Sequence, residues 1–351
     1  VLYINLGEPA DYLEATAEQF GMATDHIEFL DLSPSGEQFQ GNQSYDLFEP
    51  DEVETTSLVE QIRETVEECQ PTRVLVDPVT ELRHLAPDDR QFRTQVLSLL
   101  DFLKSHGATV VLTSQAAASV PDDDLQFLAD TVLSLAVDDD HRTLSVPKFR
   151  GSAARRGPHT VTITDGGMSL WPALDPTDHY RKGSIATLSS GVAELDALLG
   201  GGLTTGTVSF LSGPTGVGKT TTGLQFMTEA ASNGQRSVLY SFEESRRTIL
   251  ARAKGIGIPL EELIDAGTVV IREIGTDELT LDEFTHRIRS EVEDEGAEIV
   301  MIDGVTGYER AFNETHSDAD HHLIKIGQYL RNMNVTGIIT NEVHQITGDF
   351  R

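Results

Sequence analysis

Residues 213–220 combine glycines, a lysine and a hydroxyl residue at a spacing suited to holding phosphate groups. The segment reads Gly-Pro-Thr-Gly-Val-Gly-Lys-Thr, which matches the pattern G-x-x-x-x-G-K-[ST]. Glycines allow backbone N–H groups to turn inward around phosphate oxygens, and a following helix adds its dipole. The apolar residues 207–211 precede the motif and a helical pattern follows it, so the pattern predicts a binding loop for ATP. The expected contacts are Gly213, Pro214, Thr215, Gly216, Val217, Gly218, Lys219, Thr220 and Thr221.

Several side chains occur where hydrolysis of a bound nucleotide would need them. We expect Lys219 to reach the β- and γ-phosphates and Thr220 to ligate Mg²⁺. Asp303 ends an apolar strand, the Walker-B position for a carboxylate that holds Mg²⁺ through water, although a strand-end aspartate can also cap the next turn. Glu243 and Glu244 end another apolar run, where a carboxylate can deprotonate the attacking water, although acidic pairs are also common on surfaces. The predicted metal ligands are Thr220 and Asp303, and the predicted catalytic residues are Lys219, Glu243 and Glu244.

An internal repeat predicts two related domains. Residues 1–8 resemble 238–244, residues 74–80 resemble 300–306, and residues 103–114 resemble 330–341. Because the spacing between partners is nearly constant, the duplication involves whole domains. Allowing one extra residue in the first copy, Gly7 aligns with Glu243 and Glu8 aligns with Glu244.

Short apolar strands alternate with helical patterns in both copies. The expected strands are 72–76, 108–113, 131–137, 143–146, 160–164, 207–212, 237–242, 268–272, 298–302 and 335–340. The expected helices are 55–69, 90–105, 219–232, 245–254, 280–295 and 318–333. This alternation predicts an α/β fold with mostly parallel sheets covered by helices on both faces.

The expected domains extend over residues 1–175 and 184–351, with a linker around 171–184 where prolines and polar residues interrupt the pattern. We expect both domains to be incomplete. The first would lack the N-terminal part with its own phosphate loop, and the second would lack its C-terminal part.

The composition is strongly acidic, with 57 acidic and 26 basic side chains and a formal charge of −31. Such a lysine-poor, acidic composition is typical of proteins from a high-salt cytoplasm. The single Cys69 excludes disulfides and a cysteine-based zinc site within this sequence. No apolar run approaches the roughly 18 residues of a membrane span, and no signal peptide is visible, so we expect a cytoplasmic protein without membrane attachment.

Two longer segments resemble the KaiC family of RecA-like ATPases, and the composition makes the resemblance one to a haloarchaeal member. Residues 188–203 read LSSGVAELDALLGGGL before the phosphate loop, and residues 241–245 read SFEES after it. The resemblance covers nearly the whole chain and implies tandem RecA-like domains. It also implies that Glu243 is the general base, that Glu244 supports it, and that the first domain, with Gly7 at that position, binds nucleotide without efficient turnover.

The same resemblance implies a homo-oligomer, a hexameric ring with ATP between subunits. In that family a Lys-x-Arg segment reaches the γ-phosphate of the neighbouring subunit, and Lys148 and Arg150 match it, although they could also be an ordinary basic strand end. The counterpart for the second domain would lie beyond Arg351.

We expect an ATP-binding and ATP-hydrolysing oligomeric switch, with possible regulatory protein partners. A DNA-dependent ATPase of the RecA or RadA type is an alternative, but it needs basic or aromatic loops, and the loops 306–320 and 342–351 are of mixed character. A serine/threonine autokinase is the other alternative.

His316, His321 and His322 match no metal-site template, and we expect a solvated loop and a helix start there.

Overall fold

The computed structural model describes residues 1–33, 50–84, 86–115, 122–138, 141–164, 166–276, 279–312 and 316–342. For residues 50–57, 138 and 316–318 it describes the backbone alone. The chain divides into two compact units. The first comprises Val1–Ala136, Leu144–Gly157 and Thr162–Ser169, and the second comprises Val137–Thr143, Pro158–Val161 and Leu170–Arg351.

Runs of aliphatic residues form a parallel five-stranded sheet in the second unit, in the order β11-β15-β14-β12-β13. The strands are β11 (Val208–Gly213), β12 (Ser237–Ser241), β13 (Val269–Glu273), β14 (Ile299–Asp303) and β15 (Thr336–Glu342). The helices are α6 (Lys219–Ser232), α7 (Arg246–Gly255), α8 (Leu260–Asp265), α9 (Leu281–Glu293), α10 (Val305–Ala311) and α11 (His316–Asn332). A short antiparallel pair, β9 (Thr187–Leu188) and β10 (Leu203–Thr204), flanks α5 (Ala193–Leu198).

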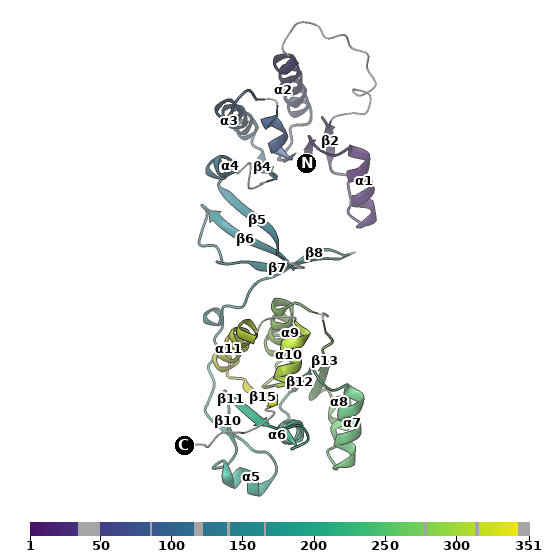
Figure 1. Ribbon diagram of the computed structural model, residues 1–351, viewed down its shortest axis with the longest axis vertical. Coiled ribbons are helices and arrows are strands. Elements are labelled where there is room, and N and C mark those ends of the chain that lie inside the picture. Colours follow the sequence, from purple (N-terminus) through teal and green to yellow (C-terminus); the bar gives the residue numbers. More distant parts are fainter. Residues whose placement is uncertain are drawn as a thin grey trace. The chain divides into compact units, whose positions relative to one another are not determined.

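The helices cover both faces of this sheet, as the sequence predicts (Figure 1). Side chains alternate along β14, so Val300 and Ile302 join the core formed with α9, α10 and α11, while Ile299 and Met301 join the core formed with α6, α7 and α8. Because both faces are buried, every residue of β14 is buried. The expected α/β fold with helix-covered parallel sheets is therefore confirmed.

The first unit contains a parallel sheet in the order β2-β1-β3-β4. Its strands are β1 (Leu2–Asn5), β2 (Glu28–Asp31), β3 (Arg73–Asp77) and β4 (Thr109–Leu112). Its helices are α1 (Ala10–Gln19), α2 (Pro50–Cys69), the 3-10 helix η1 (Val79–Arg83), α3 (Asp89–Ser105) and α4 (Asp123–Leu128). Aliphatic side chains from the strands, α2 and α3 form one core.

The two sheets repeat the same arrangement, because β2-β1-β3-β4 follows the order of β13-β12-β14-β15. Asn5 pairs with Asp77 in the first sheet, and Ser241 pairs with Asp303 in the second. The next residue in each copy, Leu6 or Phe242, donates its N–H to the carbonyl of that aspartate, at 2.8 and 3.2 Å. Gly7 therefore aligns with Glu243 directly. The extra residue allowed in the sequence comparison is wrong, because β1 begins at Leu2 and Leu2 is the counterpart of Val238.

Residues 131–171 depart from the expected alternation of strands and helices. They form a four-stranded sheet in chain order from β5 (Thr131–Asp138), β6 (His141–Phe149), β7 (His159–Thr164) and β8 (Gly167–Trp171). The two residues between β5 and β6 can join only antiparallel strands, because a parallel connection needs a dozen or more. In the described residues of this segment the strands follow one another without intervening helices, so the parallel arrangement of the two main sheets does not extend to it.

Part of the predicted linker at 171–184 is buried or half-buried, whereas residues 180–184 are exposed. We call residues 171–181 the strap; it includes the short helix η2 (Pro176–Asp178). Leu174 of the strap is 6% exposed and belongs to the core of the second unit. The interpretation as a plain linker fails because an apolar residue lies among the prolines and polar residues that suggested it.

Within the described residues, no helix has the length and apolar character needed to cross a bilayer.

Candidate functional site

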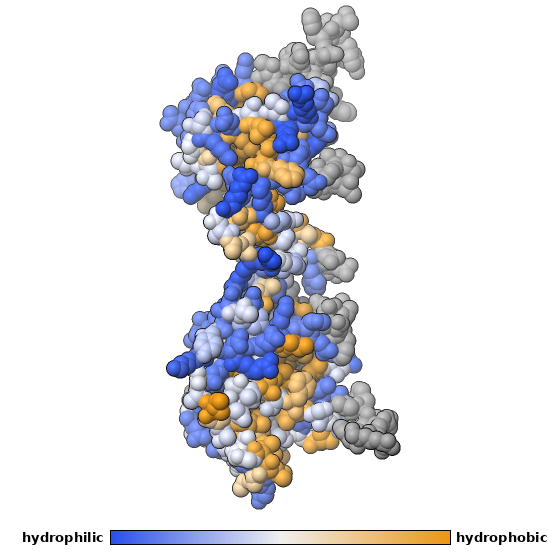
Figure 2. Space-filling view, turned by 90° about the vertical axis from the view of Figure 1, so that its left-hand side faces the viewer, coloured by the Kyte–Doolittle hydropathy of each residue, from blue (hydrophilic) through white to orange (hydrophobic). Residues whose placement is uncertain are grey.

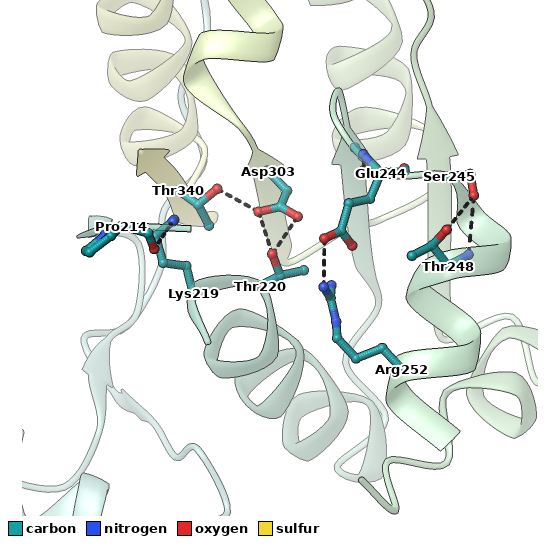
Figure 3. A network of polar contacts seen from close by, with 10 residues as sticks. Pro214, Lys219, Thr220, Glu244, Ser245, Thr248, Arg252, Asp303 and Thr340 are labelled. Carbon is teal, nitrogen blue, oxygen red and sulfur yellow. Dashed lines mark hydrogen bonds and ion pairs between the residues drawn. The ribbon is translucent and has the colours of Figure 1, made fainter. Parts of the chain in front are cut away.

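The phosphate-loop motif lies between the end of β11 and the start of α6, as the sequence predicts. Gly216 and Gly218 have φ angles of +80° and +98°, a backbone region that strongly favours glycine. The Lys219 ammonium donates to the carbonyls of Gly213 and Pro214, at 2.9 and 3.0 Å, and so lies over the loop (Figure 3). Thr215, in the loop, donates a hydrogen bond to Glu342 at the end of β15.

Asp303 lies beside the first turn of α6. The Thr220 hydroxyl donates to its carboxylate, with Oγ1 2.9 Å from Oδ2 and 3.1 Å from Oδ1. Thr340 on β15 donates to Oδ1 at 2.6 Å and accepts the N–H of Gly304 at 2.8 Å (Figure 3). Burial raises the pKa of Asp303, and the bonds from the two threonines act in the opposite direction.

This donor set fits a magnesium ion. A hydroxyl from Thr220 and a carboxylate from Asp303 are hard oxygen donors within 2.9 Å of each other, which is the chemistry that Mg²⁺ prefers. Both stand at the carboxyl end of the sheet, where open α/β sheets bind their ligands. Thr221 occupies the next position of the same helical turn.

Glu243 and Glu244 follow β12 on the same edge of the sheet. The Ser241 hydroxyl donates to the carbonyl of Glu244 at 2.7 Å, which fixes the turn that carries both carboxylates. Arg252 on α7 forms an ion pair with Glu244 at 2.7 Å (Figure 3). A cleft of about 430 Å³ is lined by both glutamates together with Ser245, Glu273 and Thr276, among others.

Two glycines at the start of α10 make room for Glu243. A Cβ atom at Gly304 would lie 2.8 Å from the Cγ and Cδ atoms of Glu243, and one at Gly307 would lie 2.7 Å from its Cγ. Gly304 also has a φ of +98°. These glycines, Thr340 and Arg252 were not expected from the sequence to belong to the site. Thr340 could have been found from the repeat, because Thr113 holds the same position in the first copy.

The family model described as "ATPase: KaiC" matches residues 1–175 and 188–350. The chain belongs to the KaiC ATPase family. The resemblance stated from the sequence is thereby confirmed at the level of the family, whereas a haloarchaeal origin stays a prediction.

Curated relatives include circadian clock oscillator proteins. The chain is 28% identical to "Circadian clock oscillator protein KaiC" of Acaryochloris marina, over 85% of this chain and 58% of the relative. It is 28% identical to the protein of the same name from Synechococcus elongatus, over 91% of this chain and 61% of the relative. It is 26% identical to "Circadian clock oscillator protein KaiC 1" of Synechocystis, over 99% of this chain and 67% of the relative. The chain thus spans roughly three-fifths of the length of the first two relatives.

The first unit repeats part of this KaiC-family site and lacks one carboxylate. Asp77 stands at the position of Asp303 and accepts hydrogen bonds from Thr113, the counterpart of Thr340, and from Tyr3. Gly7 replaces Glu243, and a Cβ atom at Gly7 would lie 3.0 Å from the Pro78 ring. The first unit therefore retains the strand-end aspartate without the carboxylate expected to act as general base.

Lys148 and Arg150 bind within the first unit in this structure. The Lys148 ammonium donates to the carbonyls of Gln126 and Phe127, at 2.9 and 3.2 Å. Arg150 forms an ion pair with Asp130 at 2.7 Å. Their expected contact with a neighbouring subunit's nucleotide stays a prediction.

His322 lies in α11, where the sequence predicted a helix, and its side chain is buried and not solvated. Its Nε2 lies 2.7 Å from the Thr285 hydroxyl, which itself donates to the carbonyl of Leu281 at 3.0 Å. Because that hydroxyl hydrogen points to Leu281, Nε2–H must donate and Nδ1 must accept from Tyr308. Burial lowers the pKa of His322 to about 4, so the ring is neutral at pH 7. His316 begins α11, and its side chain lies outside the described atoms.

Proposed function

We propose that this chain binds ATP with Mg²⁺ in the loop at residues 213–220 and hydrolyses it with Glu243 as the general base. The contact between the Thr220 hydroxyl and the Asp303 carboxylate carries the proposal, because it joins the phosphate-loop helix to the strand-end acid at the proposed metal position. The family match supports it, since the matching model is named for an ATPase.

Each side chain has one proposed task. Lys219 leaves its loop carbonyls and binds the β- and γ-phosphates, and the backbone N–H groups of residues 215–219 surround the phosphate oxygens. Thr220 and Asp303 would hold Mg²⁺, which would offset negative charge on the phosphates. Glu243 accepts a proton from the attacking water, and Glu244, fixed by Arg252, holds the turn on which Glu243 stands.

The proposal extends to the whole protein. We propose tandem domains at residues 1–175 and 184–351, and a cytoplasmic homo-oligomer, a hexameric ring, with ATP between subunits. Lys148 and Arg150 would serve a first-domain nucleotide in the neighbouring subunit. With Gly7 in place of Glu243, that nucleotide would be bound and turned over slowly. The ring would act as a nucleotide-dependent switch for other proteins.

Calorimetric titration of Mg·ATP into the chain in molar KCl tests the binding proposal. Lys219→Ala should weaken affinity at least tenfold, which corresponds to about 1.4 kcal/mol. Lys254→Ala is the matched control, because Lys254 is an exposed lysine in the last turn of α7. Unchanged affinity in Lys219→Ala would contradict the proposed site.

A further inference from the structure

The first unit has an apolar groove between α2 and α3. A cavity of about 370 Å³ is lined on its apolar side by Leu58, Val59, Ile62, Leu82, Leu99 and Phe102, which we call the first-unit groove. Val59 is 48% exposed. Figure 2 shows hydrophobic surface bordered by hydrophilic residues on the first unit. Apolar surface gathered in one hollow, and not scattered singly, is typical of a site that another chain segment covers.

The internal repeat identifies the counterpart of this groove in the second unit. Ile62 lies as many residues before Asp77 as Ile288 lies before Asp303, so these two isoleucines hold matching positions. By the same count Leu58 matches Phe284. Relative to the matching residues Thr113 and Thr340, Leu99 holds the position of Ile326. Phe102 likewise holds the position of Tyr329. The counterpart therefore lies between α9 and α11, and its walls are formed by residues at the same positions.

The strap covers that counterpart. Leu174 joins the core that includes Ile288, Ile326 and Tyr329. The Asn332 side chain donates to the carbonyl of Pro176 at 2.7 Å, and the backbone N–H of Arg181 donates to the carbonyl of Asn332 at 2.8 Å. These bonds fix both sides of the turn at η2 across the end of α11.

An arginine and a glutamate at the edge of the groove occupy the same positions in both units. In the second unit the Arg181 guanidinium donates to the carbonyl of Val292 at 3.0 Å, and His179 lies 3.1 Å from Glu293. Glu293 also pairs with Arg289 at 3.2 Å. The same counting pairs Glu293 with Glu67 and Arg289 with Arg63, and both first-unit side chains are exposed. The first-unit groove thus presents the apolar walls and the carboxylate that receive the strap in the second unit.

We propose that the first-unit groove is a docking site for an extended peptide segment with the chemistry of the strap: a leucine-sized side chain between prolines, followed by an imidazole or guanidinium group. The occupied counterpart carries this inference, because α9 and α11 already hold such a segment there, with Leu174 in their shared core and His179 against Glu293 and Tyr329. The inference is independent of nucleotide binding.

A labelled peptide of residues 170–183 tests the proposal by fluorescence anisotropy, with the complete 351-residue chain in molar KCl. We expect saturable binding that Val59→Asp weakens at least tenfold. Leu97→Asp is the matched control, because Leu97 on α3 is 45% exposed and does not line the groove. A second variant, Leu99→Ser, changes the opposite wall and should also weaken binding. A peptide with Leu174→Asp should not bind.

Three outcomes would overturn the proposal. The first is the absence of saturable binding by a chain whose thermal unfolding is cooperative. The second is equal weakening by Val59→Asp and Leu97→Asp. The third is a dimer in sedimentation velocity that Val59→Asp alone converts to monomer, since a second copy of the chain would then be the occupant.

Discussion

Asp303 shows how a single buried carboxylate shapes the proposed site. It is 7% exposed, and burial raises its pKa because ionised groups lose hydration there. Thr220 and Thr340 donate hydrogen bonds to the ionised form and partly offset that cost. Thr340 also accepts the N–H of Gly304. One hydroxyl on β15 therefore holds both the carboxylate and the backbone turn that follows it.

Replacing Thr340 by valine should destabilise the protein, because valine has the same shape without the hydroxyl. The N–H of Gly304 and one oxygen of Asp303 would lose a partner in a buried place, which costs about 1–3 kcal/mol. Urea unfolding at pH 7 measures this loss. Thr340→Ser keeps the hydroxyl and should stay closer to the original protein than Thr340→Val. Equal stability of the valine variant and the original protein would refute the assigned role.

The two glutamates after β12 should differ in their contribution to turnover. Glu243→Gln should retain Mg·ATP binding and slow hydrolysis by roughly 10²–10⁴-fold, the range for loss of a general base. Glu244→Gln should slow hydrolysis less, because its effect passes through the pair with Arg252. Steady-state phosphate release and calorimetry separate turnover from binding. If Glu244→Gln slows turnover and Glu243→Gln does not, the roles within the pair are reversed.

Among the elements, α11 is hydrogen-bonded to both α9 and α10 through the neutral side chain of His322. Nε2–H of His322 donates to Thr285 on α9, and Nδ1 accepts from Tyr308 on α10. Burial and the positive charge of Lys325 lower the pKa of His322 to about 4. Its folded-state pKa lies below the ordinary value of about 6.5, so the folded protein binds fewer protons than the unfolded chain between those values.

His322 should make stability fall as pH decreases from about 6.5 to about 4. The contribution of His322 to the free energy of unfolding is complete above pH 6.5 and is lost toward pH 4. The pKa shift limits this contribution to about 3 kcal/mol. His322→Gln keeps a donor and an acceptor without a titrating ring, so its unfolding free energy should vary less over this range. His321→Gln, at an exposed position on the same helix, is the control. Identical pH profiles for both variants would contradict this account.

The sequence predicted these elements well where one periodicity dominated. All five strands of the second sheet were expected within two residues of their ends, because each contains a short apolar stretch between helical or loop patterns. The strands β5, β6 and β7 were expected at 131–137, 143–146 and 160–164, whereas β8 was not expected. The parallel arrangement does not extend to this segment, since strand direction depends on the connections. The phosphate loop was recognisable because its chemistry is local. Arg252 and Thr340 were missed because their partners, Glu244 and Asp303, are set by tertiary contacts.

At the scale of the whole molecule, the proposed catalytic parts are distributed unequally between the two units. The phosphate loop, Glu243 and Asp303 belong to the second unit, whereas Lys148 and Arg150 belong to the first. The first unit has Gly7 where the second has Glu243. If like domains assemble with like domains in a ring, Lys148 and Arg150 face first-domain nucleotides and not the loop at residues 213–220.

The double variant Lys148→Ala/Arg150→Ala should therefore leave ATP turnover by this chain unchanged within about twofold, a small change beside the 10³–10⁵-fold effect of a cation supplied in trans. Loss of the Arg150 side chain should change stability little, because Arg150 and Asp130 are both exposed and exposed ion pairs contribute little. Phosphate release in molar KCl measures turnover, with Arg252→Ala as a variant expected to slow it from within the second unit. A tenfold or larger loss in the double variant would mean that first-unit cations reach the second-unit loop, and the assembly of like domains with like domains would be wrong.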